Sequence, residues 1–258
     1  ITAATTNTIA ATEKLSVDAG AGTDTLVIAA SNDVDTASIG ARYTNFEALE
    51  VVASQDASLV TGISSITAKG DSIAVSGLNS TNAVNITARD DASGGNNVVN
   101  ALGLAFKVAS GKNDVASISV VDKTATQNVS LTALDVNGIE TVNVDFSTGT
   151  SGTYSELSFA ANQADMLKAL NITGSADVHL NLVANTLDVV ATTIDASALT
   201  GKFKLTDSST LVAGSKVIST SQADTIAAGD AGVTYQTGAG KDAVTTTAAL
   251  ILADGIND

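Results

Sequence analysis

The chain has 258 residues, of which 44% are hydrophobic and only 3% aromatic, with no proline, no cysteine and a formal net charge of −15. A chain of this length can bury a substantial core, here mainly aliphatic, and without cysteine it holds neither disulfides nor thiolate metal sites. Its 12 lysines and arginines are scattered along the sequence, which excludes nucleic acid as a partner and favours cations.

Short runs of β-type residues recur along the chain, and most alternate apolar side chains with Thr, Ser, Asn or Asp at a period of two. Clusters of Gly, Asn, Asp and Ser separate these runs and supply turn geometry. In chain order, strands are predicted at 26–29, 49–53, 73–77, 84–88, 106–110, 118–122, 129–134, 141–146, 170–174, 178–184, 187–191, 203–206, 216–220 and 233–237. The pattern therefore predicts an all-β chain.

One segment departs from this rhythm. Residues 156–170, "ELSFAANQADMLKAL", place apolar side chains near a period of 3.6, which predicts a small helical insertion. A weaker helical pattern covers 42–50. The stretch 147–155, "STGTSGTYS", is the best candidate linker, so the elongated segment 1–258 has a possible division there, into 1–148 and 149–258.

The spacing of the strands fits two architectures. Very short strands, small polar loops and recurring Thr and Asn favour a parallel β-solenoid, a β-helix-like stack of coils. With about 20 residues per coil and a rise of roughly 4.8 Å, the chain would form a rod on the order of 60 Å long. A β-sandwich remains the alternative, because periodicity alone does not separate the two folds.

One nonapeptide pattern, small-Gly-x-Gly-x-Asp-x-apolar-x, occurs as "AGAGTDTLV" at 19–27 and as "TGAGKDAVT" at 237–245. It matches the calcium-binding nonapeptide GGxGxDxUx except at the first position. The glycines allow positive φ, so that backbone carbonyls converge, and the aspartate adds a hard carboxylate oxygen. The candidate calcium-site residues in these stretches are Gly20, Gly22, Asp24, Gly238, Gly240 and Asp242.

A full calcium site takes six to eight oxygens, so neighbouring turns must contribute. Asp224 precedes Asp242 by the length of two nonapeptides, which is one full coil of a β-roll. This pairing predicts that Asp242 contributes more to calcium affinity than Asp24. The remaining candidate ligands are Asp33, Asp35, Asp224 and, off register, Asp230. For each stretch, a Gly/Asp turn without metal is the alternative.

The sequence resembles bacterial surface-layer proteins of the RTX, calcium-binding type. The resemblance lies in the nonapeptides and in "NFEALEVVA" (45–53), "VNGIETVNVDF" (136–146) and "TTIDASALTGKFKLT" (192–206) followed by "ADTIAAG" (223–229). It implies a secreted structural protein of the bacterial cell surface, exported by type I secretion, that self-assembles into a two-dimensional lattice and uses Ca²⁺ for folding and lattice contacts. Anchoring to cell-surface polysaccharide would involve regions outside this sequence.

The sequence is expected to be a fragment of a longer protein, because it opens at Ile1 and stops within a Gly/Asp-rich stretch. The alternative function is a stalk or passenger segment of a secreted RTX adhesin that binds a surface glycan or a host partner. The sequence contains no apolar run long enough to predict a membrane span.

Enzyme motifs are missing from the sequence, and we expect no enzyme. The single histidine, His179, is predicted to be exposed on a strand, and neither Gly-x-Ser-x-Gly nor His-Glu-x-x-His occurs. The acidic pairs Asp90/Asp91 and Glu47/Glu50 have no aromatic sugar platform beside them, so they are interpreted as solvated acids.

Overall fold

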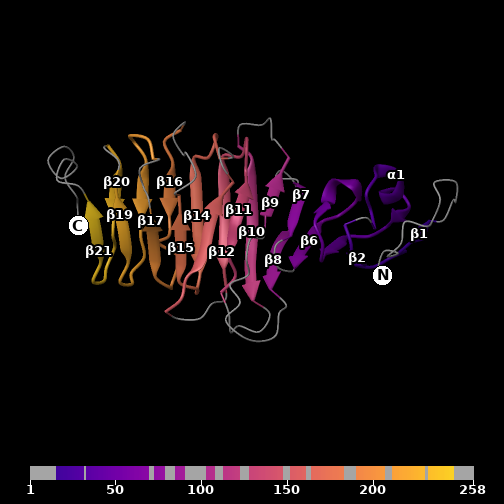
Figure 1. Cartoon of the computed structure of the whole chain (residues 1–258), viewed down its shortest axis with the longest axis horizontal. Coiled ribbons are helices and arrows are strands. Elements are labelled where there is room, and N and C mark those ends of the chain that lie inside the picture. Colours follow the sequence, from indigo (N-terminus) through magenta and orange to yellow (C-terminus); the bar gives the residue numbers. More distant parts are fainter. Residues whose placement is uncertain are drawn as a thin grey trace.

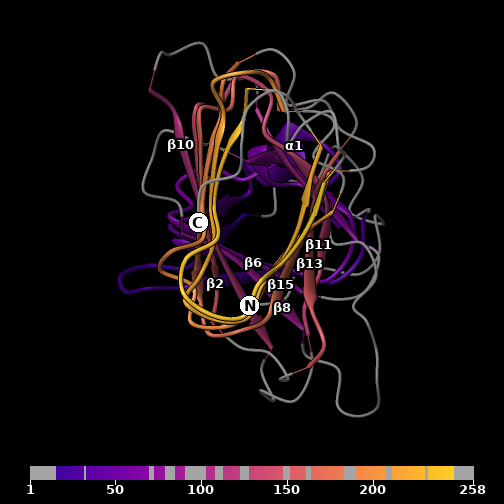
Figure 2. The ribbon, with the colours of Figure 1, turned by 90° about the vertical axis from the view of Figure 1, so that its left-hand side faces the viewer.

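The computed structural model describes residues 16–31, 33–69, 73–78, 85–90, 103–107, 113–122, 128–147, 152–160, 164–182, 190–206, 211–229 and 232–246. They form a parallel β-solenoid in which the chain passes alternately through a ten-stranded and a nine-stranded sheet (Figure 1). Seen along the rod, the two sheets are the facing walls of a flattened coil (Figure 2). The predicted all-β solenoid is confirmed, and the sandwich alternative is wrong, because the described strands pair in parallel.

Strands with even numbers from β2 to β20 form the ten-stranded sheet, in chain order along the rod. They are β2 (Thr25–Ile28), β4 (Ala48–Val51), β6 (Ser65–Lys69), β8 (Asn85–Asp90), β10 (Val115–Asp122), β12 (Thr141–Phe146), β14 (Ala169–Gly174), β16 (Thr193–Asp195), β18 (Lys216–Ile218) and β20 (Thr234–Gln236).

Strands with odd numbers from β5 to β21 form the nine-stranded sheet, again in chain order. They are β5 (Gln55–Asp56), β7 (Ala74–Leu78), β9 (Gly103–Phe106), β11 (Leu131–Asp135), β13 (Ser155–Phe159), β15 (Val178–Asn181), β17 (Phe203–Thr206), β19 (Thr225–Ala228) and β21 (Ala243–Thr246). A two-stranded sheet, one short α-helix and one 3-10 helix complete the N-terminal end: β1 (Val17–Asp18), β3 (Tyr43–Thr44), α1 (Ala37–Gly40) and η1 (Ala57–Leu59).

The core lies between the two sheets and consists of aliphatic side chains stacked coil on coil. In β12, Val142, Val144 and Phe146 point inward and are fully buried, while the residues between them are partly exposed. Register places Val142 against Leu170 and Val144 against Ile172 of the next coil. Burial of each such side chain stabilises the fold by about 1.5–3 kcal/mol, so strict period-two alternation holds each coil in register.

The coils differ in length, although the strands stay aligned. Ala48 pairs with Ser65 in the next coil, whereas Ile86 pairs with Ile118, a step along the chain that is nearly twice as long. The last coil is regular, because Thr225 pairs with Ala243, two nonapeptides further on. The predicted coil of two nonapeptides, which separates Asp224 from Asp242, is therefore confirmed.

The predicted helix over 156–170 is wrong. Its first residues belong to β13 and its last residues to β14, and the described residues between them form a turn. Ser155, Leu157 and Phe159 are buried at a period of two, and pairing of β13 with β11 and β15 satisfies its backbone. The helical pattern over 42–50 is also wrong, since β3 and β4 occupy it and α1 ends before it.

Both sheets continue across the candidate linker at 147–155. On its two sides β12 pairs with β14 and β11 pairs with β13. Of the other predicted strands, 187–191 falls largely outside the described residues, as does the second half of 106–110.

Candidate functional site

The two nonapeptides fold into the same turn. Gly20 and Gly238 have φ of 88° and 81°, and Gly22 and Gly240 have φ of 134° and 132°. Each turn leads from one strand into the next, from β1 to β2 and from β20 to β21. The positive φ expected for the four glycines is thereby confirmed.

The C-terminal turn lies directly on the turn that precedes it by one coil. The N–H of Asp224 donates to Oδ1 of Asp242 at 2.9 Å. A Cβ added to Gly240 would overlap the carbonyl oxygen of Gln222, so glycine is required for this close approach. The structure thus brings Asp224 and Asp242 together, as their spacing predicts.

The carboxylate of Asp224 is nevertheless fully used by protein donors. Its Oδ1 accepts the N–H of Phe203 (2.7 Å), and its Oδ2 accepts the N–H of Thr220 (2.9 Å) and the hydroxyl of Ser219 (2.5 Å). Asp224 is only 2% exposed. A carboxylate with these donors links neighbouring coils through hydrogen bonds. Its oxygens then have little capacity left to bind a cation.

The N-terminal turn offers a different environment. The N–H of Asp24 donates to Oε2 of Glu47 at 3.0 Å, which brings two acidic residues of successive coils to one corner. Oδ2 of Asp24 is buried and has no hydrogen-bond partner. A buried carboxylate oxygen without a donor is costly unless a cation or a proton balances it, and Oδ2 of Asp114, beside Glu140, is buried without a partner in the same way.

Of the other predicted ligands, Asp33 and Asp35 lie between β2 and α1, outside the two turns. Oδ2 of Asp33 accepts the N–H groups of Ala29 (3.2 Å) and Ala30 (2.9 Å), and its Oδ1 is buried without a partner. Asp35 is exposed, and Asp230 lies outside the described residues. Within the described ranges, no three His, Cys, Asp or Glu side chains gather closely enough to hold a metal ion by themselves, so a calcium ion at either turn would need backbone carbonyls as further ligands.

Acidic residues that sequence reasoning missed recur at several corners of the coils. Each stands directly before the first residue of a strand, and with the predicted ones the series is Asp24, Glu47, Asp114, Glu140, Asp177, Asp224 and Asp242. The N–H of Asp114 donates to Oε2 of Glu140 at 2.9 Å, which repeats the Asp24–Glu47 bond. The signal that would have found them is an acidic residue directly before a β-type run.

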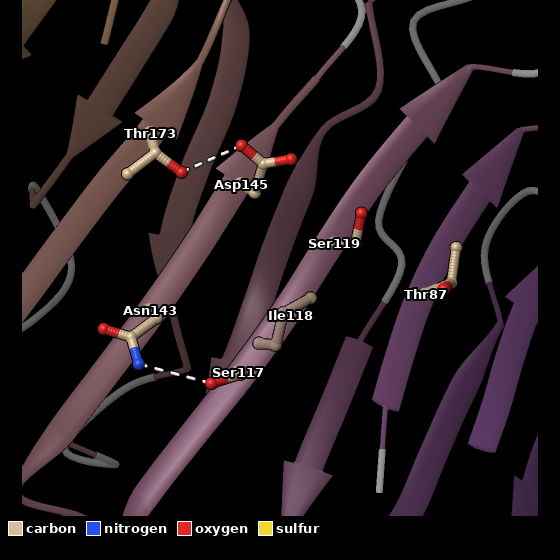
Figure 3. A pocket seen from close by; sticks show the side chains of 7 residues that line it. All are labelled: Thr87, Ser117, Ile118, Ser119, Asn143, Asp145 and Thr173. Carbon is tan, nitrogen blue, oxygen red and sulfur yellow. Dashed lines mark hydrogen bonds between the residues drawn. The ribbon is translucent and has the colours of Figure 1, made fainter. Parts of the chain in front are cut away.

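Polar side chains on the outer face of the ten-stranded sheet form a ladder across coils. Nδ2 of Asn143 donates to Oγ of Ser117 (3.2 Å), Nδ2 of Asn171 donates to Oδ1 of Asn143 (2.8 Å), and Oγ1 of Thr173 donates to Oδ1 of Asp145 (2.8 Å). A shallow groove of about 250 Å³ runs over these rungs (Figure 3), lined by Thr87, Ser117, Ile118, Ser119, Asn143, Asp145 and Thr173.

His179 lies on the outer face of the nine-stranded sheet and is half-buried, where exposure was expected. Its Nε2 lies 2.6 Å from the hydroxyl of Thr206, and its ring meets that of Tyr154 edge to face at 6.4 Å. Burial, followed by the charge of Lys204, lowers the pKa of His179, while Glu156 acts in the opposite direction. Which of the two groups donates in this contact depends on the tautomer of the His179 ring.

Comparisons with protein-family models, with curated proteins and with solved structures found no match for this chain. No helix in the described ranges is long and apolar enough to cross a membrane.

Proposed function

We propose that this chain is a structural, self-assembling segment of a calcium-dependent bacterial surface layer. The observation that carries the proposal is the use of polar and acidic residues at the corners and on the outer faces. Asp224, Glu47 and Glu140 tie one coil to the next, and Asn143 and Asn171 join neighbouring rungs. Such residues build a repetitive scaffold.

Calcium is the proposed ligand, and the Asp24–Glu47 corner is its proposed place. The buried, unpartnered Oδ2 of Asp24 supports this choice, as does the formal charge of −15. Asp24 and Glu47 would supply carboxylate oxygens, and the backbone of the turn containing Gly20 and Gly22 would supply carbonyls. A bound ion would reduce repulsion between like-charged copies at contact range, where salt does not screen it.

Electron microscopy tests the proposal directly. The purified full-length protein is placed in millimolar calcium chloride and, separately, in sodium chloride of equal ionic strength. Ordered two-dimensional sheets are expected with calcium only, because bridging requires a hard cation of high coordination number. Sheets that form equally in both salts would show that calcium is not required for assembly. If sheets form in neither salt, the proposal of a two-dimensional lattice is wrong.

A second candidate is a stalk segment of a secreted adhesin that binds a surface glycan. The groove of about 250 Å³ over β8, β10, β12 and β14 favours it, since hydroxyl, amide and carboxylate groups line it. Several of these groups already form hydrogen bonds with one another between neighbouring coils. No aromatic ring lines the groove. Retention of the protein on immobilised polysaccharide, lost on Asn143→Ala, would favour the adhesin.

A further inference from the structure

The acidic corners of the solenoid differ in how their carboxylates are used. Both oxygens of Asp177 and both oxygens of Asp224 accept hydrogen bonds from the protein. In contrast, Asp24 and Asp114 each have an Oδ2 that is buried without a hydrogen-bond partner. We call the corners at Asp177 and Asp224 saturated, because protein donors occupy both oxygens, and the corners at Asp24 and Asp114 open.

At each open corner the next coil adds a glutamate. The N–H of Asp24 donates to Oε2 of Glu47 at 3.0 Å, and the N–H of Asp114 donates to Oε2 of Glu140 at 2.9 Å. This backbone hydrogen bond occupies one oxygen of the glutamate and neither oxygen of the aspartate. Each open corner therefore holds two carboxylates from successive coils and one buried oxygen that no donor reaches.

The corner formed by Asp114 and Glu140 lies near the middle of the rod, where β10 pairs with β12 (Figure 1). Asp114 is 5% exposed and Glu140 is 4% exposed, whereas Asp24 and Glu47 at the other open corner are only partly buried. The fold thus removes two neighbouring carboxylates from water at this corner. Such burial is strongly unfavourable unless opposite charge accompanies it.

Lys168 of the following coil supplies only part of this opposite charge. Its Nζ lies 3.9 Å from Oε1 of Glu140, and its side chain is 50% exposed. In the ion pair of Lys69 and Glu50, the corresponding distance is 2.8 Å. A long, half-exposed contact is weakened by solvent, and it leaves Oδ2 of Asp114 without a partner.

We propose that the corner of Asp114 and Glu140 binds a hard divalent cation, with Oδ2 of Asp114 and a carboxylate oxygen of Glu140 as ligands. Carboxylate oxygens are the ligands that such ions prefer, and water fills the remaining positions. With two protein carboxylates the affinity is modest, with a dissociation constant of roughly 10⁻⁴ to 10⁻³ M. The ion links β10 to β12, and it does so whether or not the protein forms a lattice.

Equilibrium dialysis of the full-length protein against millimolar calcium chloride tests the site by the number of ions bound per chain. Glu140→Gln keeps an oxygen to accept the N–H of Asp114 but removes the charge, and Asp114→Asn removes the other charge. Each variant should bind close to one ion fewer than the unsubstituted protein. Asp177→Asn is the matched control at a saturated corner and should leave the number of bound ions unchanged.

Glu47→Gln separates this site from the calcium site proposed at Asp24 and Glu47. Loss of an ion with Glu47→Gln but not with Glu140→Gln or Asp114→Asn would overturn the second site and keep the first. Loss with Glu140→Gln and Asp114→Asn alone would keep the second site and remove the first. If none of these variants loses an ion, as when the two buried carboxylates share a proton, both sites are wrong.

Lys168→Gln gives a second readout that does not depend on changing a ligand. Removal of a positive charge beside the ion should tighten calcium binding at this corner, roughly fivefold, because like charges repel. The measurement is made in the Glu47→Gln background, with Glu140→Gln added as the control in which the gain disappears. If Lys168→Gln lowers the stability of the fold and leaves calcium affinity unchanged, Lys168 itself is the partner of the two carboxylates and the cation site is overturned.

Discussion

At the scale of the residue, seven acidic side chains share a position: Asp24, Glu47, Asp114, Glu140, Asp177, Asp224 and Asp242. They stand directly before strands, where the backbone turns a corner and its N–H groups leave the ladder. Asp177 accepts the N–H groups of Gly152 (3.0 Å) and Lys202 (2.8 Å), from the coils on either side. Carboxylates at these corners therefore satisfy backbone donors that the sheets leave unpaired.

Asp224 provides a test of this role. Asp224→Ala leaves the N–H groups of Phe203 and Thr220 without their acceptor in a buried corner, and we expect a loss of about 3 kcal/mol in the free energy of unfolding. Ser221→Ala, at an exposed position of the same turn, should change it by less than about 0.5 kcal/mol. Urea unfolding of the two variants measures the difference, and equal midpoints would contradict it.

Asp24 and Asp242 differ in their expected importance for calcium. The sequence favours Asp242 because of its partner Asp224, but that partner is saturated by protein donors, whereas Asp24 has an unpartnered oxygen beside Glu47. We now expect Asp24→Asn to weaken calcium binding more than Asp242→Asn. Calorimetric titration measures both. Millimolar calcium should stabilise the unsubstituted protein by about 0.5–1.5 kcal/mol per site. If Asp242→Asn instead weakens calcium binding more than Asp24→Asn, the calcium site lies at Asp242.

His179 makes stability depend on pH. Burial and Lys204 lower its pKa below the usual 6.5, so the folded state binds a proton less readily than the unfolded state. Its contribution is present above about pH 6.5 and is lost as the pH falls through the folded pKa. The stability of the unsubstituted protein relative to His179→Asn should therefore decline as the pH falls below about 6.5. Lys204→Gln should make this decline smaller. If the unsubstituted protein and His179→Asn show the same dependence of stability on pH, His179 does not contribute to it.

At the scale of the element, period-two alternation was sufficient to predict most strands, including the regularly alternating run at Thr141–Phe146. It failed at β13, where Leu157 and Phe159 fit a strand and Leu157, Ala160 and Ala164 fit a helix. Pairing with β11 and β15 selects the strand. That information lies in neighbouring coils, so a local pattern does not contain it.

Glycines show how closely one coil approaches the next. Gly174 has φ of 113°, and an added Cβ would overlap the backbone of Phe146, whereas Gly152 has φ of 90° and open space around it. Both substitutions by alanine carry the strain of positive φ, about 1 kcal/mol or more, and only Gly174→Ala adds a clash. We expect Gly174→Ala to lower the unfolding free energy by at least about 2 kcal/mol more than Gly152→Ala. Similar losses in thermal unfolding would show that φ alone matters.

At the scale of the whole molecule, the sequence predicts a stack of coils but not their lengths. The short coil from Ala48 to Ser65 and the long coil from Ile86 to Ile118 both pair in register, because the stack constrains the strands and leaves the number of residues between them free. The same reason limits prediction of the site. The spacing of Asp224 and Asp242 is local and was predictable, whereas the saturation of Asp224 depends on donors from Phe203, Ser219 and Thr220 that the fold brings together.

Removal of a whole coil should preserve the solenoid, because each coil contacts mainly its neighbours. Thr141 pairs with Ala169, so deletion of the segment 141–168 places Ala169 directly after Glu140, and β14 then takes the place of β12 beside β10. The shortened chain should keep its β-sheet circular dichroism per residue and should unfold with a smaller denaturant slope, since less surface is exposed.

Deletion of the segment 141–167 is the matched control. It leaves Lys168 in place of Ala169 after Glu140 and turns every side chain of β14 to the opposite face, so that Asn171 and Thr173 enter the core and Leu170 and Ile172 face solvent. Burial of polar groups in place of aliphatic ones costs several kcal/mol at this point of the stack. The deletion 141–167 should therefore lose the cooperative unfolding that the deletion 141–168 retains. If both deletions unfold alike, the corner after Glu140 accommodates the extra residue and β14 keeps its register.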